Sequence, residues 1–479
     1  MKFGHQKLYI AGEIRDAADG ARRDVICPAT EEVIATVAWS GPADAEAALA
    51  AAAEGFRVWS RTSINRRVEL MQRLRALVIR DQDRLREVVC FEHGKTWEQA
   101  EEDVVSLINA LGYYSEEILR MRGEILPDAD GTFEHKLVRE PLGVVVAYLA
   151  WNFPLLNLAF KLGPSLAAGC SIIIKPSSET PVSALMVGKL CAEAGLPGGV
   201  VNVIAGPNDP VASILSSSNI PRLLTLIGST ATAQRIIRQG SSSIKRHSME
   251  LGGNAPAIVF ADADLDLAAT LICGLKFSNS GQICVAPNRV LVEQSVFDEF
   301  AAKIVRHAGE VKIGHGRGSG ATMGPLINGA ARERIEGWVN EAIAQGASVL
   351  HGGRRPTNQP KGFYYEPTVL TGVTTAMRVC SDEVFGPVVS LLSFKDESDA
   401  LAQANATDAG LSSFVFTRDH SRALRVSAAL EFGEVMINGA KYGIDLPHGG
   451  IKQSGLGHDC SHLALHDYLT VKRITTSRR

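Results

Sequence analysis

A cysteine preceded by glycine and glutamine, in Gly281-Gln-Ile-Cys284, is the first side chain that could carry covalent chemistry. A thiol becomes a nucleophile where positive charge or backbone amides stabilise its thiolate. The glycine lets the backbone approach a ligand closely. A buried cysteine that acts as a small hydrophobic residue is the alternative, and the tetrapeptide by itself leaves both open.

Two other polar side chains could complete such chemistry. Glu250 precedes a Gly-Gly pair, so its carboxylate stands on flexible backbone and could turn toward a water molecule. Asn152, in Trp151-Asn-Phe-Pro154, follows a buried-strand pattern, and its amide could donate to a developing oxyanion. The alternatives are a solvated carboxylate for Glu250 and a helix-capping residue for Asn152.

Polar residues also follow two further strand patterns, where a dinucleotide would bind. Lys175 opens the run Lys-Pro-Ser-Ser-Glu-Thr-Pro and could bind ribose hydroxyls or a phosphate. Gly228-Ser-Thr230 ends a strand and opens a helix, whose first amides could face a pyrophosphate. Neither turn contains Gly-x-Gly-x-x-Gly, so the common dinucleotide-binding fingerprint is absent.

Alternating strands and helices must position these residues. Residues 43–59 and 66–92 repeat apolar side chains at helical spacing. From residue 137 on, strands are predicted at 144–149, 171–175, 200–204 and 223–227, with helices at 155–168 and 182–194. This series predicts parallel strands joined by right-handed crossovers, with a ligand at their carboxyl ends.

A strand at 257–260 begins a second series of the same kind. The sequence therefore predicts an α/β fold with a Rossmann-like parallel-sheet cofactor domain (1–122 and 136–253) and an α/β catalytic domain (254–430). The segments 123–135 and 461–479 fit neither series. We expect a projecting ribbon and a final strand that form a small β oligomerisation element, because neither has an evident partner within one subunit. Residues 431–460 are predicted as a loop region.

The composition narrows the class of protein. Among 479 residues 46% are hydrophobic and 21% charged, as in average globular proteins. A formal net charge of −3 gives no basis for binding nucleic acid or an anionic membrane. No apolar run approaches a membrane helix and no signal core opens the chain, which predicts a cytoplasmic protein. The eight cysteines show no Cys-x-x-Cys pair, so neither disulfides nor a metal site are expected, and all but Cys284 are predicted to be buried hydrophobic residues.

The motifs, taken in order, resemble the aldehyde dehydrogenase superfamily over nearly the whole chain, and look closest to its succinate-semialdehyde dehydrogenase-like group. They are Trp151-Asn-Phe-Pro, Lys175-Pro-Ser-Ser-Glu-Thr-Pro, Gly228-Ser-Thr, Glu250-Leu-Gly-Gly, Gly281-Gln-Ile-Cys, Met323-Gly-Pro-Leu, Glu383-Val-Phe-Gly-Pro-Val and Lys452-Gln-Ser-Gly-Leu-Gly.

The resemblance implies NAD(P)⁺-dependent oxidation of an aldehyde to its acid. Cys284 attacks the carbonyl, and the Asn152 amide and the Cys284 N–H hold the thiohemiacetal oxygen. Hydride transfer to the nicotinamide leaves a thioester, which water activated by Glu250 hydrolyses. The cofactor-binding residues implied are Trp151, Lys175, Ser178, Gly206, Gly228, Ser229, Leu251, Glu383 and Phe385.

Two other functions remain open. A catalytically silent relative usually lacks the nucleophile or the base, and this chain keeps Cys284 and Glu250. A branch of the superfamily that passes the acyl group to coenzyme A generally lacks the carboxylate at Glu250, so this residue favours a free acid as product.

The substrate is predicted to be a small polar or anionic aldehyde. Succinate-semialdehyde dehydrogenases hold the substrate carboxylate with two arginines, where this chain has Phe160 and Ser278, so the charge-assisted clamp is missing. The loop that lines the substrate mouth in the family offers Lys441, His448, Lys452 and His458, which could hold a small anion or be solvated. Succinic semialdehyde, lactaldehyde and 3-sulfolactaldehyde are the candidates.

The resemblance also bears on the cofactor and on assembly. NAD-preferring relatives carry a glutamate three residues after the motif lysine, where this chain has Ser178 and the glutamate has moved to Glu179. A neutral serine beside Lys175 predicts that NADP⁺ is accepted at least as well as NAD⁺. Relatives pair the ribbon and the C-terminal strand across a dimer, which predicts a homodimer or homotetramer.

Overall fold

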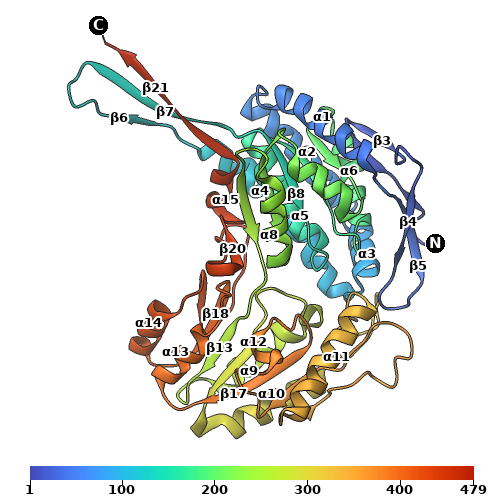
Figure 1. The fold of residues 1–479 in the computed structure, drawn as a ribbon, viewed down its shortest axis with the longest axis vertical. Coiled ribbons are helices and arrows are strands. Elements are labelled where there is room, and N and C mark those ends of the chain that lie inside the picture. Colours follow the sequence, from blue (N-terminus) through green and yellow to red (C-terminus); the bar gives the residue numbers. More distant parts are fainter. Residues whose placement is uncertain (479) are drawn as a thin grey trace.

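The computed structural model describes residues 1–478 and places two large, mainly parallel sheets in two lobes (Figure 1). The α/β class predicted from the sequence is confirmed. The eight-stranded sheet has the order β20-β12-β11-β8-β9-β10-β2-β3 and the seven-stranded sheet the order β15-β16-β17-β14-β13-β18-β19. Strands of the first are β2 (Leu8–Ile10), β3 (Glu13–Arg15), β8 (Val144–Tyr148), β9 (Ser171–Lys175), β10 (Val201–Val203), β11 (Pro221–Ile227), β12 (Arg246–Glu250) and β20 (Gly455–Leu456).

The direction of the chain reverses within the eight-stranded sheet. From β8 it passes through α5 (Pro154–Ala168), β9 and α6 (Val182–Ala194) to β10, and then returns to β11 on the other side of β8. The strands β12, β11, β8, β9 and β10 are all parallel. Loops that leave the carboxyl ends of β8 and β11 therefore part in opposite directions and open a crevice between them.

Helices cover the eight-stranded sheet much as the periodicity predicted. α1 (Pro42–Trp59) and α4 (Trp97–Arg120) are continuous, whereas the predicted helix over 66–92 is two helices, α2 (Ile64–Arg80) and α3 (Gln82–His93). Asp81 separates them because its backbone, at φ −99° and ψ 13°, leaves the helical region. The remaining helices of this lobe are α7 (Ser213–Ser217), α8 (Thr230–Gly240) and α15 (Ser461–Asp467).

The seven-stranded sheet is parallel except for its edge strand β15. Two separate apolar clusters pack around it. Its strands are β13 (Pro256–Val259), β14 (Arg289–Glu293), β15 (Ser348–His351), β16 (Thr368–Thr371), β17 (Val388–Phe394), β18 (Ser412–Phe416) and β19 (Glu434–Ile437). Its helices are α9 (Leu265–Phe277), α10 (Phe297–Glu310), α11 (Gly329–Ala344), α12 (Arg378–Ser381), α13 (Glu397–Asn405) and α14 (His420–Ala429). The segment 431–460, predicted as a loop region, contributes β19 to this sheet and β20 to the other.

A three-stranded antiparallel sheet projects from the body of the molecule (Figure 1). It consists of β6 (Glu124–Leu126), β7 (Phe133–Pro141) and β21 (Leu469–Ser477). The expectation that the ribbon and the terminal strand lack a partner within the subunit is wrong, since β21 pairs with β7 from Leu469 opposite Pro141 to Ser477 opposite Phe133. The long pairing satisfies the backbone groups that the sequence left without partners.

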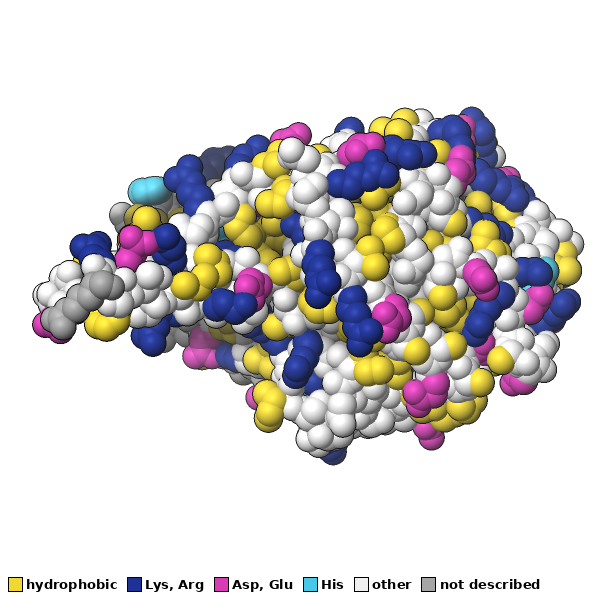
Figure 2. Space-filling model, turned by 90° about the horizontal axis from the view of Figure 1, so that it is seen from above, with side chains coloured by type: hydrophobic (Ala, Val, Ile, Leu, Met, Phe, Trp, Pro, Cys, Tyr) yellow, Lys and Arg dark blue, Asp and Glu magenta, His cyan; other side chains and the backbone are white. Residues whose placement is uncertain are grey.

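A further small sheet near the N-terminus joins β1 (His5–Gln6), β5 (Val33–Ala38) and β4 (Arg22–Ile26). Seen from above, the surface carries basic, acidic and hydrophobic side chains intermixed, without a continuous basic stripe on this face (Figure 2). No helix within residues 1–478 is long and apolar enough to cross a membrane.

Candidate active site

A cavity of about 780 Å³ lies between the two lobes. On one side are residues that follow the carboxyl ends of β8, β11 and β12, and on the other are residues at the amino ends of β14, β17 and β19. It brings together most of the residues singled out in the sequence, namely Trp151, Asn152, Phe160, Gly228, Ser229, Glu250, Leu251, Ser278, Cys284, Glu383, Phe385, Lys441 and His448. Lys175, Ser178, Gly206, Lys452 and His458 do not line it.

Cys284 stands on an unusual stretch of backbone. After α9 ends at Phe277, Asn279, Ser280 and Gly281 all have positive φ, at 50°, 56° and 71°. A Cβ at Gly281 would lie 2.1 Å from the carbonyl oxygen of Gly386, so only glycine fits there. Such backbone is retained where the surroundings hold it in place, often at functional sites. Cys284 is half-buried, and the other seven cysteines are buried, as the sequence predicted.

The Met323-Gly-Pro-Leu motif braces this turn. Ser280 Oγ donates to the carbonyl oxygen of Gly324 at 2.7 Å, and the backbone N–H of Ile327 donates to Gln282 Oε1 at 2.9 Å. Gln282 Nε2 in turn donates to the carbonyl oxygen of Asn279 at 3.0 Å. The motif and the residue that follows it thus fix the backbone just before Cys284.

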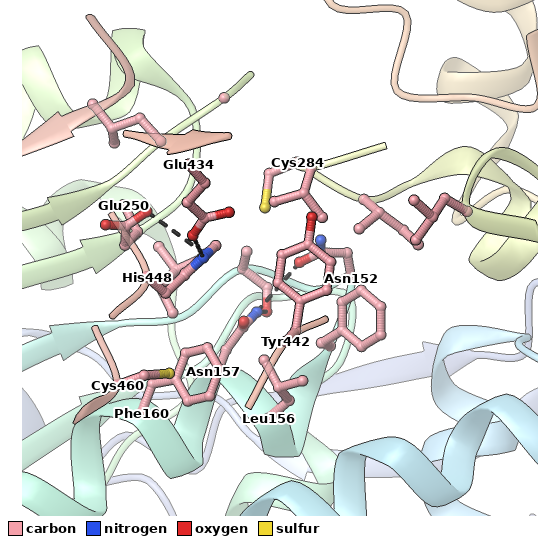
Figure 3. Close-up of a pocket in the computed structure, with 18 of the residues that line it drawn as sticks. Asn152, Leu156, Asn157, Phe160, Glu250, Cys284, Glu434, Tyr442, His448 and Cys460 are labelled. Atoms are coloured by element: carbon pink, nitrogen blue, oxygen red, sulfur yellow. Dashed lines mark hydrogen bonds and ion pairs between the residues drawn. The ribbon is translucent and has the colours of Figure 1, made fainter. Parts of the chain in front are cut away.

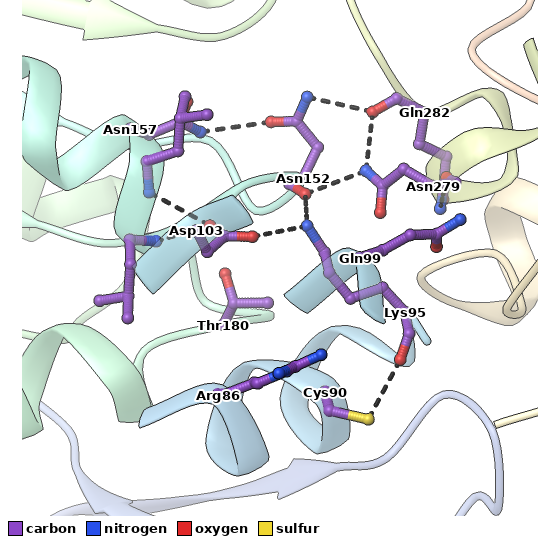
Figure 4. Close-up of polar contacts among 12 residues, drawn as sticks. Arg86, Cys90, Lys95, Gln99, Asp103, Asn152, Asn157, Thr180, Asn279 and Gln282 are labelled. Carbon is purple, nitrogen blue, oxygen red and sulfur yellow. Dashed lines mark hydrogen bonds and ion pairs between the residues drawn. The ribbon is translucent and has the colours of Figure 1, made fainter. Parts of the chain in front are cut away.

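Asn152 lies in a buried network of hydrogen bonds (Figure 4). Its side chain donates to the Gln282 carbonyl at 3.1 Å and accepts from Asn157 Nδ2 at 3.3 Å. Its own carbonyl accepts from Lys95 Nζ and from Asn279 Nδ2, both at 3.0 Å. Asn152 is not a helix cap, because the residue before α5 is Phe153.

Two residues that the sequence did not single out anchor this network. Lys95 Nζ lies 2.7 Å from Asp103 Oδ2, and both side chains are fully buried. Asp103 Oδ1 accepts from the backbone N–H groups of Leu155 and Leu156 at 2.9 and 3.1 Å, so it satisfies the first turn of α5. Lys95 and Asp103 belong to none of the recognised motifs, and a lone charged residue in a sequence is predicted to be exposed.

Glu250 lies on the opposite side of the cavity in a poorly satisfied setting (Figure 3). Its side chain is buried, and neither carboxyl oxygen has a hydrogen-bond partner among the described residues. Burial raises the pKa of Glu250 to about 8, although the nearby His448 opposes the shift. A carboxyl group with such a pKa is suited to accept a proton near neutral pH.

His448 is held beside Glu250 by a second carboxylate. Its Nδ1 lies 2.7 Å from Glu434 Oε1, and its Nε2 lies 3.8 Å from Glu250 Oε2. Burial lowers the pKa of His448, but hydrogen bonds with Cys284 and Glu434 and the charges of both carboxylates outweigh it and hold the pKa well above its usual value. Burial raises the pKa of the Cys284 thiol, and the contact with His448 opposes that rise. Sequence reasoning missed Glu434, the first residue of β19, because no motif contains it.

Most of the residues for which the resemblance implies cofactor binding also lie on this cavity. The backbone N–H of Gly253 donates to Glu383 Oε1 at 3.0 Å, and burial raises the pKa of Glu383 to about 7. Trp151 and Phe385 meet edge to face at 5.4 Å, and Phe385 has a positive φ of 49°. Ser229 caps α8, since its side chain accepts from the backbone N–H of Thr232 at 3.3 Å.

Lys175 lies outside the cavity wall, at the end of β9. It is buried, and its Nζ donates to Asn208 Oδ1 at 3.2 Å, with no ion pair to a carboxylate among the described residues. Burial, with a contribution from Arg23, lowers the pKa of Lys175 to about 8. A buried ammonium without a carboxylate partner, at the carboxyl end of β9, fits a bound ribose or phosphate.

Comparisons with known proteins point to one family. The family model described as "Aldehyde dehydrogenase family" matches residues 14–474. The chain is 38% identical to the mitochondrial succinate-semialdehyde dehydrogenase of Oryza sativa over 97% of this chain and 88% of that protein. It is also 38% identical to the 3-sulfolactaldehyde dehydrogenase of Pseudomonas putida, over 98% and 96% of the two chains.

Solved structures give the same result. An NADP-dependent enzyme of Escherichia coli superposes with a TM-score of 0.97 at 37% identity, covering 99% of this chain and 98% of that one. The betaine aldehyde dehydrogenase of Staphylococcus aureus in complex with NAD⁺ gives 0.96 at 34% identity, covering 98% and 94%. The chain belongs to the aldehyde dehydrogenase family. It is an oxidoreductase that uses NAD or NADP to oxidise an aldehyde.

Proposed function

We propose that Cys284 is the nucleophile, Asn152 the oxyanion donor and Glu250 the hydrolytic base of this reaction. The observation that carries the proposal is their meeting in one cavity with the candidate cofactor residues. The Cys284 sulfur adds to the aldehyde carbon, and the carbonyl electrons move to the oxygen. The Asn152 amide, fixed by Gln282 and Asn157, needs no reorganisation to donate to that oxygen. A bound NAD(P)⁺ supplies the hydride acceptor.

The resulting thioester is hydrolysed at Glu250. Its carboxylate has no hydrogen-bond partner to displace and accepts a proton from water, whose oxygen then attacks the thioester carbon. The carboxylic acid leaves and the Cys284 thiolate returns. Coenzyme A as the acyl acceptor is the alternative. To decide between water and coenzyme A, the purified protein is incubated with an aldehyde, NADP⁺ and coenzyme A, and the products are separated by mass spectrometry. A predominant acyl-CoA product overturns the assignment of Glu250.

For the substrate we propose a small polar or anionic aldehyde. Phe160 and Ser278, the positions without arginine, both line the cavity, so the two-arginine carboxylate clamp is missing from the wall itself. The cationic side chains among the described lining residues are Arg334, Lys441 and His448. Arg334 donates to the Val384 carbonyl near the cofactor side, and His448 is neutralised by Glu434, which leaves the exposed Lys441 at the mouth for a substrate anion.

A panel of aldehydes tests this substrate class. Absorbance at 340 nm is followed with succinic semialdehyde, glutaric semialdehyde, lactaldehyde, 3-sulfolactaldehyde, betaine aldehyde and propanal. We expect the short hydroxylated or anionic aldehydes to have the highest kcat/KM. Lys441→Gln raises KM for the anionic members and leaves KM for propanal unchanged. Highest kcat/KM for propanal, or an equal effect of Lys441→Gln on all aldehydes, contradicts the proposal.

For the cofactor we propose that NADP⁺ is used at least as well as NAD⁺. Glu179, the displaced glutamate, has its Oε1 3.8 Å from a guanidinium nitrogen of Arg23. A carboxylate at position 178 would repel the 2′-phosphate, because two like charges about 4 Å apart cost roughly 4 kcal/mol at an effective dielectric of about 20. Ser178 is neutral. Arg23 lies close enough to Lys175 to help lower its pKa, so two cationic side chains are near this position.

The test compares kcat/KM for both cofactors in the wild type, Ser178→Glu and Ser178→Ala. Ser178→Glu should lower kcat/KM for NADP⁺ by at least about tenfold and spare NAD⁺. Ser178→Ala, which removes the hydroxyl without adding charge, is the control for steric disturbance and has a smaller effect. A wild type that favours NAD⁺ a hundredfold or so, with Ser178→Glu unchanged, contradicts the argument.

For assembly we propose a homodimer or homotetramer formed through the projecting sheet. The side chains of Ile125, Phe133, Val471 and Ile474 on this sheet are exposed in the single chain, and β6 is an open edge strand. Exposed apolar side chains on an open edge favour pairing with another chain. Light scattering at micromolar concentration checks the mass, and a monomer contradicts the proposal.

A further inference from the structure

His448 is fixed in the cavity more firmly than a residue that only lines it. Its backbone N–H donates to the Asp459 carbonyl at 2.9 Å, and the Asp459 N–H donates back to the His448 carbonyl at 2.7 Å. Its imidazole Nδ1 lies 2.7 Å from Glu434 Oε1, and Ser412 Oγ donates to the other Glu434 oxygen at 2.5 Å. Backbone and side chain together set where the ring points (Figure 3).

The partner of Nδ1 determines what the other nitrogen does. A carboxylate accepts but does not donate, so Nδ1 carries the hydrogen in the bond to Glu434. In the neutral ring, Nε2 is then the acceptor. Cys284 lines the same cavity, its thiol is close enough for the imidazole to oppose the rise of its pKa, and Nε2 is the nitrogen left to face it. A thiol, an imidazole and a carboxylate in this sequence form the arrangement that activates a cysteine nucleophile.

We propose that His448, positioned by Glu434, is the base that activates Cys284, and that Glu250 acts only in hydrolysis. This assignment rests on the proposed role of Cys284 as the nucleophile. It moves His448 from the substrate-binding residues, where the sequence suggested it, to the residues that act on the reacting sulfur. Glu434 is a positioning residue because it acts through the imidazole.

Protons balance through the cycle. The Cys284 proton moves to Nε2, which gives a thiolate beside an imidazolium whose other N–H faces Glu434. The thiolate adds to the aldehyde, the adduct loses hydride to the cofactor, and a thioester results while His448 stays protonated. Glu250 takes one proton from water, the hydroxyl attacks the thioester, and the departing sulfur returns as a thiolate to the imidazolium. The proton on Glu250 then passes to solvent.

The charges around His448 suit this role. Two carboxylates face the ring, and both favour its protonated form. The neighbouring ammonium of Lys161 is neutralised by Asp459 at 2.6 Å and does not oppose it. The titratable and charged groups that face the imidazole from the surrounding elements are Glu434, Glu250, Cys284, Tyr442, Lys161, Asp459 and Cys460. Burial raises the pKa of the Cys284 thiol, and His448 is the group that opposes this rise.

Alkylation of Cys284 by iodoacetamide tests the proposal without aldehyde or cofactor. The rate is followed by mass spectrometry from pH 5.5 to 10, with Cys284→Ala as the background for the buried cysteines. In His448→Gln and His448→Phe we expect the rate at pH 7 to fall about tenfold or more, as a rise of one pKa unit would give, and the profile to shift to higher pH. Glu434→Gln should give a smaller shift in the same direction.

Three controls make the outcome decisive. His458→Gln, an exposed histidine of the neighbouring segment, should alkylate as the wild type does. Glu250→Gln should keep rapid alkylation at neutral pH while its thioester hydrolysis fails. Thermal unfolding identifies variants that have lost their fold, and Glu434→Gln, which keeps the size of the side chain, then decides. The proposal is overturned if the pH profile of Cys284 alkylation is unchanged in folded His448 and Glu434 variants. It is also overturned if alkylation is slow in Glu250→Gln alone.

Discussion

The two walls of the cavity on either side of Cys284 differ in how well their buried polar groups are satisfied. On the Asn152 side, buried polar groups pair with one another: Lys95 with Asp103, and the Asn152 carbonyl with two donors. On the Glu250 side, two carboxylates share the one imidazole of His448, and neither oxygen of Glu250 has a hydrogen-bond partner among the described residues. Burial raises the pKa of Glu250 to about 8, because a buried carboxylate without hydrogen bonds is unfavourable.

This difference matches two tasks, since one wall holds a group in place and the other can exchange a proton. A satisfied network holds the Asn152 amide still, which suits the oxyanion-binding role proposed for it. An unsatisfied carboxylate can exchange a proton and turn toward water, because no hydrogen bond has to be broken first. Substitutions on the Asn152 side should therefore lower the stability of the fold and kcat at every pH. Substitutions on the Glu250 side should alter single steps of the reaction and their dependence on pH.

The largest expected effect is at Glu250. In Glu250→Gln, hydride transfer proceeds and thioester hydrolysis fails, so steady turnover falls by about 10²–10⁴-fold after a burst of one NAD(P)H per active site. Stability should be unchanged or greater, because the variant removes a buried carboxyl group that has no hydrogen-bond partner. Stopped-flow absorbance at 340 nm and thermal unfolding measure the two quantities. Steady turnover at the wild-type rate would remove Glu250 from its role.

The opposite result is expected on the other wall. Asp103→Asn leaves the Lys95 ammonium buried without a counter-charge and should destabilise the fold by about 3–5 kcal/mol. Denaturant unfolding measures the loss. The double variant Lys95→Met/Asp103→Leu, which removes both charges, should be more stable than Asp103→Asn. Its activity should be lower than that of the wild type, because the Asn152 carbonyl loses its lysine donor. Wild-type stability in Asp103→Asn would show that the pair does not brace the site.

The motifs predicted one wall better than the other. Asn152, Glu250 and Cys284 were singled out in the sequence because each lies in a motif beside a strand or turn, and all three line the cavity. The carboxyl ends of β8 and β11 were predicted to carry the ligand, and they do border the cavity. The amino ends of β14, β17 and β19 were not, because the general rule for parallel sheets places ligands at the carboxyl ends.

Residues that act through contacts far apart in the sequence could not be predicted. Lys95 reaches the Asn152 carbonyl across 57 positions, and Glu434 reaches His448 from the start of a strand within a segment that read as loop. Only the fold brings such pairs together. The pairing of β21 with β7 was missed for the same reason, since more than three hundred residues separate the strands and neither shows its partner in its own pattern.

The smallest effect, and the sharpest test of the two walls, is the dependence of hydrolysis on pH. Glu250 acts as a base only when ionised, and burial raises its pKa from an ordinary 4.5 to about 8. When hydrolysis limits turnover, the rate should therefore rise about tenfold between pH 7 and pH 9.

Asn152→Ala should lower kcat by about 10²–10³-fold without moving this rise along the pH axis, because the amide does not titrate. His448→Gln should move the rise to higher pH, since the imidazolium lowers the pKa of Glu250. Profiles of kcat against pH for the three proteins measure this, and a rise that shifts in Asn152→Ala but stays fixed in His448→Gln would reverse the assignment of the two walls.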